Sequence, residues 1–271
     1  MFDTGAVSTS TGERRARVEH LRALVDRTRP VSLAEQRVLP VLPALEELFA
    51  VGPAGVGGLR RGSVVGVSGH SGATALALAL AAGPTRSGSW GAFVGLPELG
   101  WAAAGELGVD LGRVVVVRPT DRARATVIAA LVDAFDVVVC GFDGMPSATE
   151  ARRLAARARE RGSVLVVVGG RAGGVGRARR AWPAAAEVQL TVVEAAWSGL
   201  GEGAGHLRER RVVVEVGGRR GLQRARRVEL LLPGRFGDVR PAPSVEQLVE
   251  QPGERSVGGR SANVTPLRRV G

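Results

Sequence analysis

The sequence GVSGHSGAT, residues 66–74, lies between a valine-rich run and an apolar segment, and this arrangement decides the fold. Residues 63–67 before it predict a buried β-strand, because they are mostly apolar and β-branched. Residues 74–82 after it predict a helix. A glycine-rich turn between two such elements leaves the first backbone N–H groups of the helix open, and the helix dipole attracts anions there. The stretch therefore has the shape of a P-loop, a turn that binds phosphate groups.

Three residues of this loop are candidates for holding a phosphate, namely Gly69, Gly72 and Thr74, but the most important side chain is missing. When the working pattern Gly-x-x-x-x-Gly-Lys-Thr is aligned on Gly72 and Thr74, Val67 stands at the first glycine and Ala73 at the lysine. The chain has no lysine at all, since every one of its 37 basic residues is arginine. The loop therefore lacks the cation that neutralises the outer phosphates of a nucleotide.

The position that would anchor magnesium is altered as well. It lies at the end of the predicted strand 136–140, where Gly141 replaces the acidic residue and Asp143 follows beyond the strand. Phosphoryl transfer depends on the electrostatic stabilisation that this lysine and this metal provide. We therefore predict that the chain is not an ATPase, that it has no catalytic residues and that it requires no cofactor. Residual ATP binding by the loop stays open as an alternative.

Strand and helix patterns alternate along residues 63–168. The predicted strands are 63–67, 91–96, 114–118, 136–140 and 163–168, and the predicted helices are 74–82, 98–107, 121–135 and 148–161. Ser147 and Glu150 form a capping box at the start of the last helix, and Gly162 stands at its end. The continuous Val/Leu strands indicate burial on both faces and predict an α/β fold with a mainly parallel sheet between helices. Three later strands, 186–194, 210–216 and 226–232, predict an antiparallel C-terminal edge.

Composition divides the chain into three segments. Residues 1–50 predict an N-terminal helical segment, which either binds a partner or packs on the core. Residues 51–235 form the α/β core. Residues 236–271 contain few large apolar side chains, which predicts a disordered tail.

Other features of the composition exclude whole classes of function. No apolar run approaches the roughly 20 residues that a membrane-spanning helix needs, and the first residues do not form an export signal. We therefore expect a cytoplasmic protein. A single cysteine and three scattered histidines predict neither a disulfide bond nor a metal site.

The excess positive charge is concentrated in residues 151–271, whereas the first half of the chain is nearly neutral. Two clusters carry the candidate binding residues, which are Arg171, Arg177, Arg179 and Arg180 in the glycine-rich segment 169–180, and Arg208, Arg210, Arg211, Arg219 and Arg220 around the predicted edge hairpin. Arginines of this kind bind DNA phosphates without sequence preference, or an acidic protein surface. They also serve as a solvated face, or protect an edge strand from pairing. Nearby, Trp182 either stacks on a base or packs at the start of a strand.

In order and spacing, residues 64–74, 91–94, 107–111 and 136–139 resemble the core of the RecA recombinase family. The resemblance covers about residues 45–232. With the eroded loop, the N-terminal helix and the basic C-terminal half, the chain looks like the ImuA-type proteins, which are RecA-like accessory factors of the bacterial DNA-damage mutasome. Two more positions depart from the family. Pro97 stands at the catalytic glutamate, with Glu98 displaced by one, and Gly169-Gly170 replace a polar sensor.

This resemblance implies a non-catalytic adaptor of translesion DNA synthesis in the SOS response, located at the nucleoid when engaged. The implied partner is a Y-family polymerase-like protein of the ImuB type, with RecA and DNA as further candidates. Two alternatives stay open. One is a RecA-like DNA-binding protein that binds or hydrolyses ATP weakly, with an arginine from elsewhere in place of the lysine. The other is a cell-division inhibitor that resembles SulA.

Overall fold

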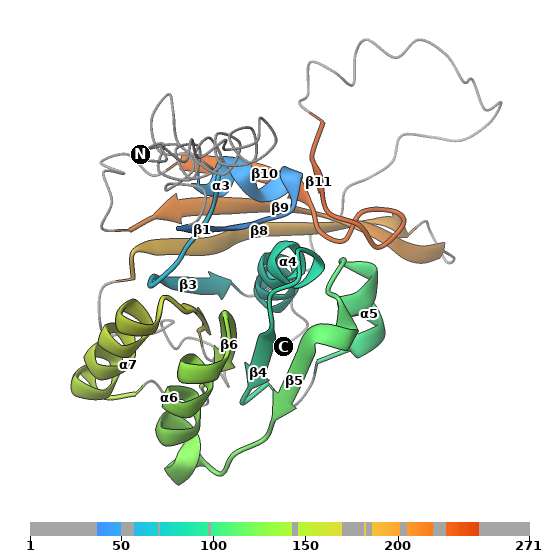
Figure 1. The fold of residues 1–271 in the computed structure, drawn as a ribbon. Helices are drawn as coiled ribbons and strands as arrows, with labels where there is room; N and C mark the ends of the chain where they lie inside the picture. Colours follow the sequence, from blue (N-terminus) through green and yellow to red (C-terminus); the bar gives the residue numbers. More distant parts are fainter. Residues whose placement is uncertain are drawn as a thin grey trace, which may run out of the picture. The chain divides into compact units, whose positions relative to one another are not determined.

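The computed structural model describes residues 37–49, 57–69, 71–96, 99–142, 146–169, 182, 186–200, 205–218 and 226–243 (Figure 1). The chain divides into two compact units, Met1–Val38 and Leu39–Gly271. The large sheet and its helices belong to the second unit. The division at residue 50 stays a prediction, although residues just before it, Leu45 and Leu48, already lie in the hydrophobic core of this unit.

A nine-stranded sheet forms the centre of the second unit, in the order β11-β10-β9-β8-β3-β7-β6-β4-β5. Its strands are β3 (Val64–Gly69), β4 (Gly91–Val94), β5 (Val114–Val117), β6 (Val137–Gly141), β7 (Val164–Val168), β8 (Val188–Leu200), β9 (Gly205–Gly217), β10 (Arg226–Leu231) and β11 (Arg240–Pro241). The strands from β8 to β5 run parallel, and β9, β10 and β11 are antiparallel to their neighbours. The predicted fold class is therefore confirmed.

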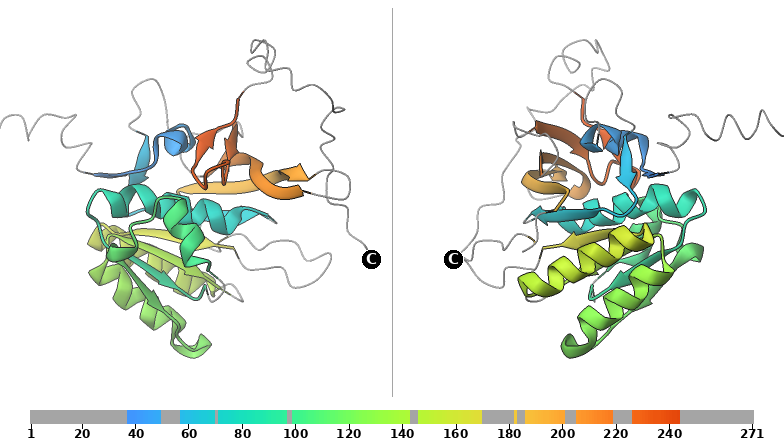
Figure 2. Two further views of the ribbon diagram at one scale, coloured as in Figure 1. Left: turned by 90° about the vertical axis from the view of Figure 1, so that its right-hand side faces the viewer. Right: turned by 60° about the vertical axis from the view of Figure 1, so that its left-hand side comes forward.

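Helices cover both faces of the parallel part of the sheet (Figure 2). On one face lie α4 (Ala73–Arg86) and α5 (Trp101–Glu106), and on the other lie α6 (Arg124–Ala134) and α7 (Ala148–Arg161). Side chains along each strand alternate between these faces. On β4, Phe93 joins the cluster around α4, while Ala92 and Val94 join the cluster around α6 and α7. Burial on both faces explains why the strands are continuous apolar runs.

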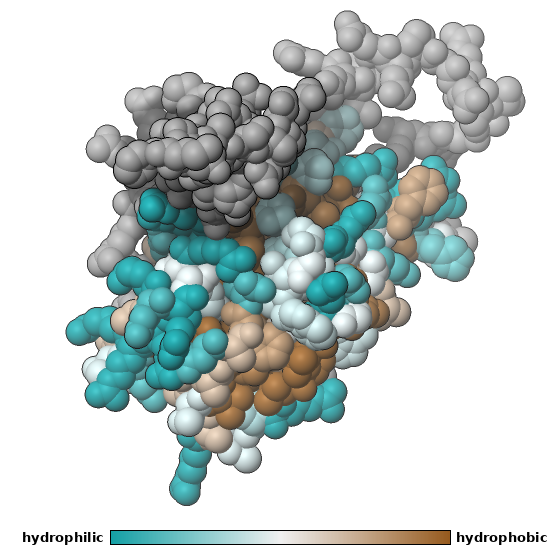
Figure 3. Space-filling model, viewed as in Figure 1, coloured by the Kyte–Doolittle hydropathy of each residue, from teal (hydrophilic) through white to brown (hydrophobic). Residues whose placement is uncertain are grey.

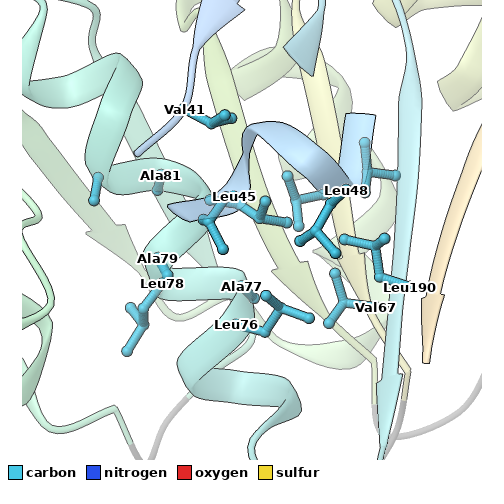
Figure 4. Close-up of a cluster of buried hydrophobic side chains, with 14 of the residues drawn as sticks. Val41, Leu45, Leu48, Val67, Leu76, Ala77, Leu78, Ala79, Ala81 and Leu190 are labelled. Carbon is cyan, nitrogen blue, oxygen red and sulfur yellow. The ribbon is translucent and has the colours of Figure 1, made fainter. Parts of the chain in front are cut away.

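The helix that follows the glycine-rich loop, α4, is enclosed on almost every side. The segment 41–49, which contains the short helices η1 (Pro43–Leu45) and α3 (Glu46–Phe49), packs beside it, and Leu48 lies near the sheet residues Val67 and Leu190 (Figure 4). Leu45, Leu76 and Leu80 are fully buried there. Each contributes about 1.5–3 kcal/mol through removal of its side chain from water. The strand before this segment, β1 (Val38–Pro40), and the strand after it, β2 (Gly58–Arg60), pair to form a separate two-stranded sheet.

Several elements match the sequence patterns closely. Helix α7 has the predicted bounds, and both hydrogen bonds of the Ser147–Glu150 capping box are present. Gly162 ends the helix with a φ of 70°, in the left-handed region that glycine tolerates. Helix α4 runs beyond its predicted end to Arg86, because Pro84 lies within the helix without ending it.

Two expectations about the C-terminal part require correction. The first strand of the predicted antiparallel edge, β8, is parallel to β3, so the antiparallel part starts only at β9. Residues 236–243 were assigned to the disordered tail, but Arg240–Pro241 form β11, which pairs with Leu230 and Leu231. This short strand lies at the edge of the sheet. It is held there by backbone hydrogen bonds to β10 and does not need large apolar side chains.

The opposite edge of the sheet is strand β5. An apolar area covers this strand in the space-filling view (Figure 3), and Val115 and Val116 are exposed there. One of these valines points to each face, since they are neighbours on a strand. Among the described helices, none is both long and apolar enough to cross a bilayer.

Candidate functional site

The three phosphate-loop candidates lie together at the carboxyl end of β3, in the middle of the sheet. Gly69 is the last residue of β3, and Gly72 precedes α4 as its N-cap residue. Gly72 has a φ of 95°, a left-handed conformation that other residues rarely adopt. Thr74 is exposed on the first turn of α4, whereas Ala73 is buried in the core. The position aligned with the lysine thus faces the packed interior.

Strand β8 packs tightly against Ser68 and Gly69, the last residues of β3 before this loop. A Cβ atom on Gly69 would lie 2.5 Å from Val192 Cβ, which is closer than real Cβ atoms approach. The Ser68 and Thr191 hydroxyls are 3.2 Å apart, and Gln189 Nε2 donates to Ser68 Oγ at 3.3 Å. The loop is therefore held by contacts with β8, independently of any ligand.

An arginine from β9 reaches the N-terminus of α4. Arg210 Cζ lies 3.5 Å from the position of a Cβ on Gly72. Its Nε donates to the carbonyl oxygen of Leu232 at 2.7 Å, and its guanidinium lies over the ring of Trp197. The residue is only 9% exposed, and this burial lowers the pKa of its guanidinium from the ordinary value. The structure thus places a buried cation beside the loop that lacks a lysine.

The position aligned with the magnesium anchor has no room for a side chain. A Cβ on Gly141, the last residue of β6, would lie 2.5 Å from Leu96 Cδ2 and 2.7 Å from the carbonyl oxygen of Gly95. Any residue other than glycine requires this end of β4 to move. A carboxylate at this position is therefore incompatible with the packing of β4 against β6.

A second buried arginine lies at the same edge of the sheet. Arg124, in the first turn of α6, donates through Nη2 to Asp121 Oδ1 at 2.6 Å and through Nη1 to the carbonyl oxygen of Gly141 at 3.5 Å. Its Nε lies 3.4 Å from the position of a Cβ on Gly95. A guanidinium that is ion-paired with Asp121 therefore lies beside the region between β4 and β6 where the resemblance implies a metal-binding carboxylate.

The structure separates the second arginine cluster into different environments. Arg208 is exposed on β9, Arg211 forms an ion pair with Glu229 across β9 and β10, and Arg210 is buried beside the loop. Arg219 and Arg220 lie outside the described residues, as do Arg171, Arg177, Arg179 and Arg180. Their role in binding DNA or a partner stays a prediction.

Trp182 is buried and packs against another aromatic residue. Its ring centroid lies 5.9 Å from that of Phe142, and the residue is 7% exposed. The packing interpretation of this tryptophan therefore fits the structure, and the base-stacking interpretation does not, because a stacking platform must be accessible.

The sequence analysis did not identify Arg124 and Arg210 as buried residues of the candidate site. Arg124 stood inside a predicted helix, and Arg210 was one member of a basic cluster. Arg210 follows Gly72 by more than a hundred residues, so no local spacing connects them. A usable signal was the alternation of Arg210 with Val212, Val214 and Val216, which places the arginine on the buried face of its strand.

Comparisons with known sequences find matches to parts of the chain. Residues 52–174 match a family model described as the MT3502 N-terminal domain. The chain is also 40% identical over 119 residues to a Mycobacterium tuberculosis protein described as uncharacterized protein Rv3395c. That match covers 44% of this chain and 57% of the relative. The chain thus spans little more than half of the relative it matches.

Among solved structures, the chain is similar to the crystal structure of the RadB recombinase. The TM-score is 0.51 at 16% sequence identity, and the match covers 74% of this chain and 97% of that one. At this identity the similarity concerns the fold alone. Together with the strand order and the loop after β3, it shows that the chain has a RecA-like fold.

Proposed function

We propose that the chain is a non-catalytic RecA-like accessory protein that supports translesion DNA synthesis by binding a Y-family polymerase-like partner. In this role the RecA-like core is a scaffold for protein contacts, with DNA and RecA as further binding partners. The protein acts in the cytoplasm and reaches the nucleoid with its partner.

The observation that carries the non-catalytic part is that the packing around Gly141 leaves no room for a side chain. A nucleotide-hydrolysing core needs a carboxylate near this strand end to hold magnesium. Leu96 and the backbone of Gly95 occupy the space in which its Cβ would lie. The guanidinium of Arg124, which is ion-paired with Asp121, lies beside them and donates to the carbonyl oxygen of Gly141.

The translesion part is supported by the resemblance to the ImuA-type proteins together with the RecA-like fold. A fold hosts many functions, so the partner has to be identified directly. The exposed Arg208 is the described residue of the basic clusters that is most accessible to an acidic partner.

Affinity capture of the tagged full-length chain from DNA-damaged cells tests this proposal. Extracts are treated with nuclease to remove bridging by DNA, and the captured proteins are identified by mass spectrometry. We expect a Y-family polymerase-like protein in the nuclease-treated sample. Recovery of the division GTPase in its place, with cell filamentation on overexpression, would favour the SulA-like alternative.

Two further measurements sharpen the test. The purified chain is expected to hydrolyse ATP with magnesium no faster than background, and a rate comparable with RecA-type ATPases would overturn the non-catalytic part. Arg208→Glu is expected to weaken capture of the polymerase-like protein by repelling acidic groups. Arg86→Glu is the matched control, because Arg86 is exposed at the far end of α4.

A further inference from the structure

The outer face of helix α7 is strongly basic. Its 14 residues include five arginines and two glutamates, and all of these charged residues are exposed. The apolar face of the helix, with Ala151, Leu154 and Ala158, is buried in the core. Hydrophilic side chains accordingly gather over α7 in the space-filling view (Figure 3). The neighbouring helix α6 contains a single arginine, which is buried, so this charge is a property of α7 alone.

Part of the charge is neutralised by carboxylates. Arg157 and Arg161 both form ion pairs with Asp133 of α6, the Arg161 pair at 3.1 Å. The carboxylate of Glu150 accepts hydrogen bonds from the backbone N–H and the hydroxyl of Ser147, at 2.9 and 2.8 Å. These two carboxylates are therefore already engaged within the fold.

Three arginines of α7 have no ion pair in the part of the chain that the structure describes, namely Arg152, Arg153 and Arg159. Arg153 lies one turn before Arg157, and two like charges at this spacing destabilise a helix. Arg152 and Arg159 lie two turns apart on one side of α7, about 10 Å along its axis. An acidic partner on this face would pair with the three arginines and offset the repulsion.

The remaining carboxylate of the helix, Glu160, favours a protein partner over a nucleic acid. Its side chain is exposed on the same outer face as Arg152, Arg153 and Arg159. A nucleic acid carries one negative charge on every phosphate, which this glutamate repels, whereas a protein segment can place a basic or neutral side chain opposite it. A second copy of the chain fits poorly as well, because its α7 face would bring arginines against arginines.

We propose that the outer face of α7, defined by Arg152, Arg153 and Arg159, docks an acidic helical segment of a protein partner. A helix presents side chains three, four and seven residues apart on one face, so its carboxylates match the spacing of these arginines. Each contact is exposed and screened by salt, which makes the docking reversible and sensitive to ionic strength. Assignment of the segment to the polymerase-like protein rests on the proposed function, whereas the chemistry of the face does not.

A fluorescent label at the centre of this face tests the proposal on the full-length chain. Ala156→Cys places a thiol at an exposed position of α7, and the natural Cys140 is buried, so a thiol reagent labels the new residue alone. The probe is a synthetic helical peptide with glutamates and one lysine on the same face. We expect the peptide to change the emission at low salt and the change to fade as salt is added. A label at Ala130→Cys, exposed on α6, is the matched control and should not respond.

Charge removal identifies the residues that bind the peptide. Replacing Arg152, Arg153 and Arg159 together by glutamine is expected to weaken binding about tenfold, as loss of three exposed ion pairs does. The fold should tolerate this change, because glutamine is a good helix former and the positions are exposed. Arg86→Gln combined with Arg122→Gln removes two exposed arginines elsewhere and should bind the peptide like the parent chain.

Four outcomes would overturn the inference. They are a label at position 156 that does not respond to the peptide, an equal response of the label at position 130, a triple glutamine variant that binds like the parent chain, and tighter binding of a short DNA duplex than of the peptide. None of these changes capture of a polymerase-like protein by the parent chain, so the two proposals fail independently.

Discussion

The guanidinium of Arg210 stacks on the indole ring of Trp197, with Cζ 5.0 Å from the ring centroid. The two residues are opposite each other on β9 and β8, in a section of the hairpin that extends beyond the last pairing of β8 with β3 at Val192. On its other side Arg210 is bonded through its backbone to Leu232 and Pro233, so side-chain contacts with β8 are what tie this end of β8 to the rest of the sheet.

Replacing Trp197 by alanine is therefore expected to lower the free energy of unfolding by about 2 kcal/mol, since a partly desolvated cation–π contact and its packing are lost. Urea denaturation followed by circular dichroism measures this change. Trp90→Ala is the matched control, because Trp90 stacks with Arg113 at 5.9 Å but is 46% exposed. Its effect should stay within about 1 kcal/mol. Equal effects of the two variants would contradict the special role of the Arg210 pair.

Restoring the carboxylate at the magnesium position is expected to damage the fold rather than create activity. Gly141→Asp inserts a Cβ 2.5 Å from Leu96 Cδ2, and such overpacking costs about 1–3 kcal/mol before the buried charge is counted. Thermal melting and an ATPase assay measure both consequences. In the control Gly217→Asp, a Cβ meets nothing within 4 Å, so a much smaller change is expected. A stable, hydrolysing Gly141→Asp chain would show that the packing at this edge is adaptable.

The capping box of α7 predicts a pH dependence of stability. Hydrogen bonds from the side chain and backbone of Ser147 hold the pKa of Glu150 below its usual value of 4.5. Because the pKa is lower in the folded chain, this contribution is complete above pH 4.5 and is lost as the pH falls below it. Glu150→Gln retains a capping side chain and should flatten this part of the pH profile. Denaturation midpoints between pH 3 and 7 on the two proteins would decide, and identical profiles would contradict the prediction.

Removing the cap itself has a simpler consequence. Ser147→Ala deletes the acceptor for the Glu150 backbone N–H at the start of α7. We expect a loss of about 1 kcal/mol of unfolding free energy, as for other N-cap substitutions. Ser87→Ala offers a comparison, because that hydroxyl bonds carbonyl groups at the end of α4, which backbone N–H groups already satisfy. Equal losses would show that the α7 cap has no special weight.

Cys140, the single cysteine of the chain, reports on opening of the sheet. It is fully buried on β6, and desolvation raises the pKa of its thiol well above the usual value. We therefore expect almost no reaction with a thiol reagent in the native chain at neutral pH, because the thiolate is the reactive form. Labelling should accelerate in parallel with unfolding by urea. Rapid labelling without denaturant would mean that β6 opens locally.

The sequence predicted the parallel part of the fold well because its signals are local. Continuous valine runs mark the strands, and Ser147, Glu150 and Gly162 mark the two ends of α7. The direction of β8 was missed, since a buried strand has the same apolar pattern whether it is parallel or antiparallel to its neighbour. The position of β11 was missed because a two-residue strand has no periodicity.

In the candidate site, too, the parts with a local sequence pattern were predictable and the parts that depend on distant segments were not. The loop with Gly69, Gly72 and Thr74 was predictable from a nine-residue pattern, and the structure brings these residues together at the end of β3. The contribution of Arg210 was not, because it depends on how β9 folds back over α4. The lack of room for a side chain at Gly141 was not predictable either, because the residues that fill this space, Gly95 and Leu96, follow β4 and not β6.

The tight approach of β8 to β3 bears on what a glycine in such a loop indicates. A Cβ on Gly66 would lie 2.1 Å from Gln189 Oε1, and one on Gly69 would meet Val192 almost as closely. The Gln189 side chain can move away from Gly66, whereas Val192 Cβ and its backbone leave no room at Gly69, so packing alone penalises a larger residue at Gly69. A glycine at this place in the loop is therefore required by the packing of the sheet itself, so its presence in a sequence does not by itself indicate that a nucleotide is bound.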